Sequence, residues 1–142
     1  MPKEVLGEND DAVNSDLAVG SLFNVKGKVV LVTGGGSGIG AMIASGFVQN
    51  GSRVYIASRK DISTYAAQLT QKGPGSCVAV SCDISSYEQQ QKLIETIKQT
   101  EGKLHFLVNN SGTNYGAPLG QYKPDMFEKV MQLNTNALFA LT

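Results

Sequence analysis

The sequence has 142 residues, of which 42% are apolar and 17% are charged, and 12 basic side chains balance 12 acidic ones. This size and composition are typical of one globular domain with a sizeable hydrophobic core. The balanced charge gives no reason to expect nucleic acid or a membrane surface as a partner. No apolar run reaches the length that a membrane-spanning helix needs.

The first 21 residues are acidic and contain few large apolar side chains. We therefore expect a mobile tail over residues 1–21 and a folded domain over residues 22–142. No basic region followed by an apolar stretch opens the chain, so no secretory signal is expected and the cytoplasm is the default location. Cys77 and Cys82 are five residues apart on one predicted strand, which points them to opposite faces and predicts two free thiols.

The most informative stretch runs through residues 28–40 and reads KVVLVTGGGSGIG. Its β-branched run predicts a strand buried on both faces, and an apolar helical pattern starts at Ile39. A glycine turn between a strand and a helix lets a phosphate approach the backbone and the positive end of the helix. The spacing is T-G-x-x-x-G-x-G, which is neither G-x-G-x-x-G nor a P-loop. A tight βα turn without a ligand is the alternative. The residues expected at the phosphates are Gly34, Ser37, Gly38, Ile39 and Gly40.

Strands and helices alternate along the rest of the chain. Further strands are predicted over residues 53–57, 77–82 and 104–108, and helices over residues 62–71, 85–102 and 124–141. Asp61 is expected to cap the second helix, and Ser85 with Glu88 to form a capping box at the third. The pattern predicts an α/β fold with a doubly wound parallel sheet in the order 3-2-1-4. Four loops then meet at the carboxyl ends of the strands, where such sheets bind ligands.

Two of these loops indicate how a dinucleotide would be recognised. Ser58 and Arg59 follow the second strand, where an NAD site usually has an acidic residue for the ribose 2′-hydroxyl. A hydroxyl and a guanidinium favour the 2′-phosphate of NADP, although Arg59 beside Lys60 could also be an ordinary surface residue. Asp83 and Ile84 follow the third strand and are suited to the amino group and the ring of adenine, or to a simple turn. His105, at the start of the fourth strand, is interpreted as structural.

Three motifs occur in a fixed order: residues 33–40, the run Asn109, Asn110, Ser111 and Gly112, and Leu133-Asn134 in the last helix. Together they resemble the short-chain dehydrogenase/reductase family, with a Rossmann-type fold, over residues 22–142. The resemblance implies that the first asparagine of the run supports neighbouring strands and that the following residues line the cofactor ribose. Ser111 stands where the family has alanine. The resemblance also implies a catalytic role for Asn134, which bends the helix and holds a water in the proton relay.

The family transfers the proton with a Ser, a Tyr and a Lys four residues after that Tyr, while NAD(P)H gives hydride. No tyrosine in these 142 residues has lysine four positions on. The resemblance therefore implies the cofactor-binding N-terminal half of a reductase, incomplete at its C-terminus and inactive alone. Its complete form would be an NADP-dependent oxidoreductase and homo-oligomer acting on a small-molecule carbonyl or alcohol, without a metal. A non-catalytic nucleotide-binding or interaction protein is the main alternative. A methyltransferase fits less well, because it would need an acid at Ser58.

Overall fold

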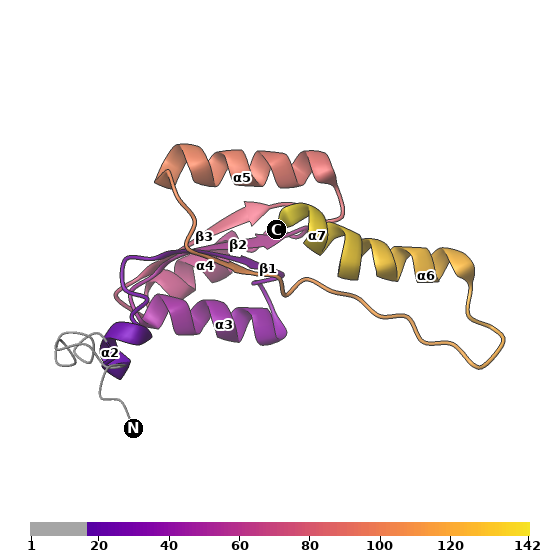
Figure 1. Cartoon of the computed structure of the whole chain (residues 1–142), viewed down its shortest axis with the longest axis horizontal. Coiled ribbons are helices and arrows are strands. Elements are labelled where there is room, and N and C mark those ends of the chain that lie inside the picture. The colour runs from indigo at the N-terminus through magenta and orange to yellow at the C-terminus, as the bar shows by residue number, and fades with distance from the viewer. Residues whose placement is uncertain (1–16) are drawn as a thin grey trace, which may run out of the picture.

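The structure, a computed structural model, describes residues 17–142 and alternates strands with helices along the chain (Figure 1). Its elements, in order, are α2 (Val19–Leu22), β1 (Val29–Thr33), α3 (Gly38–Gln49), β2 (Arg53–Ser58), α4 (Ser63–Thr70), β3 (Ser76–Ser81), α5 (Tyr87–Glu101), β4 (Phe106–Val108), α6 (Pro124–Met131), the π-helix η1 (Gln132–Asn136) and α7 (Ala137–Leu141). The predicted tail lies largely outside the described residues. Within its described part, α2 begins, so helical structure starts earlier than the sequence predicted.

The four strands form one parallel sheet in the order β3-β2-β1-β4, which confirms the predicted fold class and strand order. β1 is an inner strand of the sheet. Its Leu31 pairs with Tyr55 of β2 on one side and with Leu107 of β4 on the other. All five residues of β1 are buried, as its β-branched run predicted. Because every strand runs the same way, the loops after the four strands meet at one edge of the sheet.

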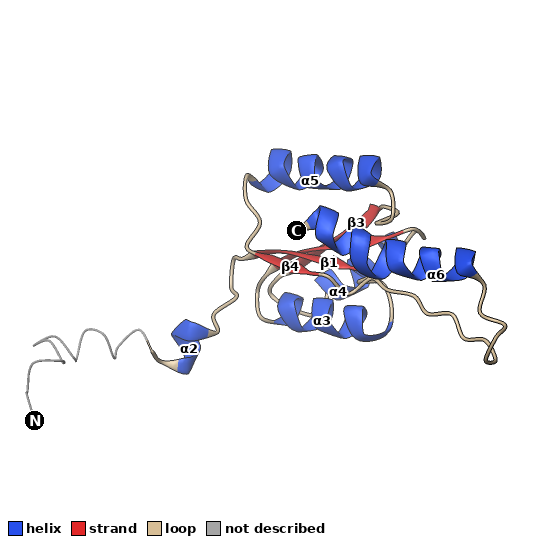
Figure 2. Ribbon diagram, turned by 45° about the vertical axis from the view of Figure 1, so that its right-hand side comes forward, coloured by secondary structure: helices blue, strands red, loops and turns tan. Residues whose placement is uncertain are grey.

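Helices cover both faces of the sheet (Figures 1 and 2). On one face α3 and α4 pack through Ala44, Val48, Ala66 and Leu69. On the other face α5 and α7 pack through Leu93, Ile97, Ala137 and Leu141. Cys77 belongs to the first core layer and Cys82 to the second, and both are free thiols, which confirms the prediction from their spacing.

Two helix boundaries differ from the sequence predictions. The N-cap of α5 is Ser86, whose hydroxyl accepts from the Gln89 amide, whereas Ser85 bonds to Asp83 instead, so the predicted capping box is wrong. Asp61 does accept from the Ser63 amide at 2.9 Å, although α4 begins at Ser63. The last helix is interrupted by η1 around Asn134, in agreement with the local bend that the family resemblance implies. The loop before it and α6 project beyond the sheet (Figure 2).

A small ionic cluster ties α5 to the sheet at the end opposite the glycine turn. The hydroxyl of buried Tyr55 donates to Glu101 Oε1 at 2.6 Å, and Arg53 Nε donates to the same oxygen at 3.0 Å. The hydrogen bond from Tyr55, opposed by burial and supported by the hydrogen bond from Arg53, lowers the pKa of Glu101 below its ordinary value. His105 supports the same end of the sheet, because its Nδ1 accepts from the Val29 amide at 2.9 Å. This contact agrees with a structural role for the histidine.

We expect Glu101→Gln to lower the free energy of unfolding by about 1 kcal/mol at neutral pH. A carboxylate whose pKa is lowered by folding stabilises the protein above its unfolded pKa and loses that contribution as the pH falls through the folded pKa. The difference between wild type and Glu101→Gln should therefore shrink as the pH drops below about 4.5. Urea titrations at pH 7 and pH 3.5 measure it, with exposed Glu95→Gln on the same helix as the control. A difference that stays constant between the two pH values would contradict this prediction.

Candidate functional site

The glycine turn joins β1 to α3 and is packed closely by its neighbours. Gly34 has φ of +66°, a left-handed conformation that favours glycine, and its amide donates to the Ala57 carbonyl at 2.8 Å. A Cβ on Gly40 would clash with the side-chain nitrogen of Asn110 and with the carbonyl of Gly34. A Cβ on Gly35 would lie 2.5 Å from Cγ2 of Ile56. These glycines are thus required by packing as well as by any phosphate that approaches the start of α3.

The loop after β4 is held against β1 by Thr33. The buried Thr33 hydroxyl accepts from the amides of Asn110 at 3.0 Å and Ser111 at 2.9 Å, and donates to the Val108 carbonyl at 3.3 Å. The side chain of Asn110 makes a further hydrogen bond to β1, because its Nδ2 donates to the Thr33 carbonyl at 2.8 Å. The resemblance gave the supporting role to the first asparagine. Here Asn110 supports β1, whereas Asn109 donates to the Thr142 hydroxyl at 3.0 Å.

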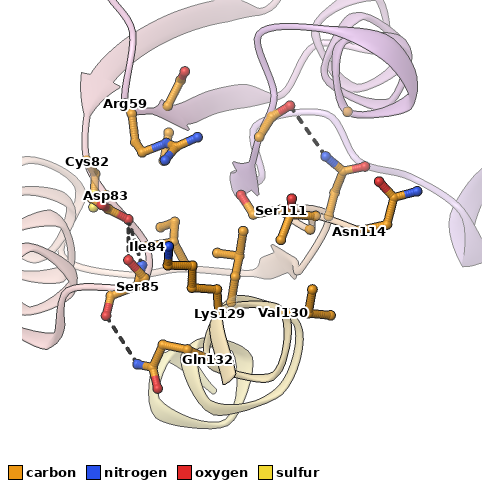
Figure 3. Close-up of a pocket in the computed structure, with 18 of the residues that line it drawn as sticks. Arg59, Cys82, Asp83, Ile84, Ser85, Ser111, Asn114, Lys129, Val130 and Gln132 are labelled. Atoms are coloured by element: carbon orange, nitrogen blue, oxygen red, sulfur yellow. Dashed lines mark hydrogen bonds between the residues drawn. The ribbon is translucent and has the colours of Figure 1, made fainter. Parts of the chain in front are cut away.

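The loops after β2 and β3 place Arg59 and Asp83 near each other (Figure 3). Asp83 Oδ1 accepts from the Ser85 hydroxyl at 2.7 Å and the Ser85 amide at 2.9 Å. These two hydrogen bonds, with a smaller contribution from the charge of Arg59, lower the pKa of Asp83. Asp83 is therefore ionised at neutral pH and can accept a hydrogen bond from a ligand N–H group. Arg59 is exposed, and Ile84 beside Asp83 is almost completely buried.

Asn134 fixes the chain that follows the β4 loop. Its Oδ1 accepts from the Thr113 amide and its Nδ2 donates to the Thr113 carbonyl, both at 2.8 Å. The π-helix places this side chain, because the extra residue in its turn changes which face of the helix Asn134 occupies. The catalytic role that the resemblance implies stays a prediction. In the structure, Asn134 holds Thr113, which lines the pocket.

The four loops and the last helix enclose a pocket of about 700 Å³, a size suited to a cofactor (Figure 3). Most of the predicted binding residues line it: Gly34, Ser37, Ile39, Gly40, Ser58, Arg59, Asp83, Ile84, Asn110, Ser111 and Gly112. Gly38, Asn109 and Asn134 are not among the residues that line it, so the cofactor-binding role of the first two and the catalytic role of Asn134 stay predictions. Gly38 has φ of +54° and serves the turn itself.

The last helix contributes pocket residues that were not predicted from the sequence, namely Met126, Lys129, Val130, Gln132 and Leu133. Met126, Val130 and Leu133 follow an i, i+4, i+7 spacing along this helix and line the pocket, and Leu133 also packs against the core. Lys129 and Gln132 lie on the same wall, and Gln132 Nε2 donates to the Ser85 carbonyl at 3.4 Å. Among residues 17–142, no three His, Cys, Asp or Glu side chains gather as a metal site would require. Within the same range, no helix has the length and apolar character needed to cross a membrane.

Comparisons with known proteins agree with this geometry. Residues 28–142 match the family model described as short chain dehydrogenase. A rhamnolipid-biosynthesis 3-oxoacyl-[acyl-carrier-protein] reductase of Pseudomonas aeruginosa is 40% identical over 119 residues, which are 83% of this chain and 46% of that protein. A tropinone reductase homologue of Arabidopsis thaliana is 33% identical over 124 residues, 86% of this chain and 46% of that protein.

Solved structures of similar proteins have the same fold. The Pseudomonas aeruginosa RhlG/NADP complex superposes with a TM-score of 0.79 at 39% identity, over 84% of this chain and 46% of that one. L-Sorbose reductase from Gluconobacter frateurii, solved with NADPH and L-sorbose, gives 0.76 at 28% identity, over 82% of this chain and 45% of that one. The chain thus spans about half the length of these relatives. The family model covers most of the chain, and the strand order and glycine turn agree with it: this protein belongs to the short-chain dehydrogenase family.

Proposed function

We propose that this chain binds NADP(H) and forms the cofactor-binding half of an NADP-dependent oxidoreductase. The observation that carries the proposal is Arg59, a guanidinium at the end of β2 that lines the pocket where an acidic residue would favour NAD. Ser58 beside it also lines the pocket, and no carboxylate stands at either position. A guanidinium can donate two parallel hydrogen bonds to the 2′-phosphate of NADP, whereas the 2′-hydroxyl of NAD cannot accept such a pair.

The other walls fit the remaining parts of such a cofactor. The Gly34–Gly40 turn leads into the start of a 12-residue helix, whose positive end suits the diphosphate. Cβ atoms on Gly34 or Gly40 would occupy the space beside Asn110, so the close backbone approach depends on glycine. The ionised Asp83 and the apolar Ile84 suit adenine, and Ser111 and Gly112 suit a ribose. When bound, the cofactor supplies a hydride to a carbonyl or accepts one from an alcohol.

Two observations support NADP rather than NAD and a reductase rather than another class of protein. The relatives at 39% and 28% identity were solved with NADP and with NADPH. The 40% identical relative is named as a 3-oxoacyl-[acyl-carrier-protein] reductase and the Gluconobacter frateurii protein as an L-sorbose reductase, so a small carbonyl or alcohol is the proposed substrate class. We assign carbonyl reduction and homo-oligomer formation to a protein of the relatives' full length, and cofactor binding to these 142 residues.

A non-catalytic nucleotide-binding role remains the second candidate. It is favoured by one sequence fact: none of the five tyrosines has a lysine four residues later. Without such a Tyr and Lys, no residue of these 142 has the family's means of donating a proton to the carbonyl oxygen. General acid catalysis typically contributes about 10²–10⁴-fold to such a reaction. Both candidates require the same cofactor pocket, so the test below addresses what they share.

Arg59→Ala should weaken NADPH binding by about ten- to a hundredfold and leave NADH binding nearly unchanged. A hydrogen bond to a charged group contributes about 1.5–3 kcal/mol, which corresponds to that change in dissociation constant. Calorimetric titration of both cofactors measures it. Lys60→Ala is the matched control, because Lys60 is the neighbouring exposed cation and does not line the pocket. Equal losses for NADPH and NADH, or equal effects of the two substitutions, would contradict the assignment of Arg59 to the 2′-phosphate.

A further inference from the structure

Gln90 is a buried amide that joins three segments of the fold. It lies near the start of α5 with 1% of its surface exposed, while the neighbouring Gln89 and Gln91 are exposed. Its Nε2 donates to the Ile84 carbonyl at 2.6 Å and to the Ala137 carbonyl at 3.1 Å. Ile84 follows β3 and lines the pocket, whereas Ala137 opens α7. One side chain therefore connects α5, a pocket wall and the last helix.

The contacts of Gln90 fix the orientation of its amide and leave one atom unpaired. Both partners are carbonyl oxygens, so only the NH₂ end of the amide can face them. Oε1 then points into buried space, where no donor among the described residues reaches it. An unpaired buried carbonyl lowers stability, and an apolar side chain of similar size would avoid that loss. The same replacement would remove the donor that Gln90 supplies to the carbonyls of Ile84 and Ala137, so the glutamine both costs and contributes stability.

The two donated hydrogen bonds have a clear geometric consequence. They hold the carbonyl of Ile84, one residue after Asp83, at a fixed distance from the residue that follows η1. Gln132 of η1 makes a second connection to the same wall through the Ser85 carbonyl, but it is exposed and its distance is 3.4 Å. The buried bonds of Gln90 are shorter, and water does not compete for them. Ile84 also packs in the same apolar cluster as Ala137, and among the hydrogen bonds between this wall and the last helix those of Gln90 are the buried ones.

We propose that Gln90 is a positioning residue that holds the wall formed by Asp83, Ile84 and Ser85 in the geometry that binds the adenosine half of the cofactor. This inference rests on the proposed function, because it assumes that adenine lies against Asp83 and Ile84. Gln90 does not line the pocket, so it acts through Ile84 rather than by touching the ligand. Its removal should weaken binding of the adenosine half and loosen residues 83–86, while the glycine turn at residues 34–40 keeps its geometry.

The test compares Gln90→Leu and Gln90→Met with Gln91→Leu, the exposed neighbour, on the full 142-residue chain. Adenosine 2′,5′-bisphosphate is the probe, because it presents only the adenosine half. We expect both Gln90 variants to bind the probe at least fivefold more weakly than wild type, and to melt at a lower temperature because the Ile84 carbonyl loses its donor, so binding is measured well below the melting temperature of each variant. Gln91→Leu should match wild type in affinity. Wild-type affinity in both Gln90 variants would overturn the proposal. An equal loss of affinity in the Gln90 variants and in Gln91→Leu would overturn it as well.

Hydrogen exchange of the ligand-free chain separates this inference from the proposed function. In Gln90→Leu and Gln90→Met, the amides of residues 83–86 should exchange at least severalfold faster than in wild type, while those of residues 34–40 stay unchanged. If wild type fails to bind the bisphosphate, the proposed function fails, and exchange alone decides the role of Gln90. Unchanged exchange at residues 83–86 in both variants would then overturn the positioning role.

Discussion

Gly40→Ala is expected to lower the free energy of unfolding by about 2–4 kcal/mol and to weaken NADPH binding by more than tenfold. The added Cβ would meet the Asn110 side chain and the Gly34 carbonyl, so it separates β1 from the loop after β4. Overpacking of this kind costs about 1–3 kcal/mol, and displacement of Asn110 removes its bond to the Thr33 carbonyl, worth about 1 kcal/mol. The same contacts shape the start of α3, where we place the diphosphate.

Gly46→Ala is the matched control for this prediction. Gly46 lies in the same helix, is exposed, and has open space around the position of a Cβ. Replacing a glycine inside a helix by alanine stabilises it by about 0.5–1 kcal/mol. Urea unfolding followed by circular dichroism measures both variants, and calorimetry measures NADPH binding. A Gly40→Ala protein as stable as Gly46→Ala would mean that the turn has more room than its contacts indicate.

Thr33→Val should lower the free energy of unfolding by about 1–3 kcal/mol, although it keeps the size and the β-branched shape of the side chain. The hydroxyl of Thr33 accepts from the backbone amides of Asn110 and Ser111, and the valine methyl group accepts from neither. The Asn110 amide also donates to the Val108 carbonyl at 3.0 Å, so the Ser111 amide is the donor left without a partner. A donor left unsatisfied in the interior costs about 1–3 kcal/mol. The loss should appear in the loop after β4, since that loop carries both amides.

Thr33→Ser keeps the hydroxyl and removes one methyl group, so it isolates the two hydrogen bonds from packing. We expect it to retain the loop and to lose about 1 kcal/mol. Urea unfolding gives the stability of both variants, and hydrogen exchange at residues 109–112 reports the loop directly. If Thr33→Val were as stable as Thr33→Ser and its loop exchanged equally slowly, the hydroxyl would not hold the loop.

The sequence alone was sufficient to predict the fold, because local patterns determine it. The buried run at β1, the glycine turn and the alternation of strands with helices predicted the order β3-β2-β1-β4 and the meeting of four loops at one edge. Arg59, Asp83 and Ile84 were predicted to lie together for the same reason, since each directly follows a strand of a parallel sheet. The pocket lining agrees with that prediction.

What the sequence did not predict depends on distant pairings. Thr33 was seen only as part of a motif, because its partners lie 77 and 78 positions away. Asn109 and Asn110 both lie beyond β4, and a strand of three residues is too short for its pattern to show which of the two supports β1. Gln90 appeared to be one of three consecutive glutamines on a polar helix, and only the packing of α5 against α7 shows that it is buried.

The central claim is that the pocket at the carboxyl edge of the sheet binds NADP(H). Calorimetric titration of the unmodified 142-residue chain with NADPH and with NADH tests it most directly. We predict one site per chain and a dissociation constant for NADPH at least tenfold below that for NADH, because Arg59 meets a phosphate in the first and a hydroxyl in the second. Equal dissociation constants for the two cofactors, or no heat of binding with either, would contradict the account.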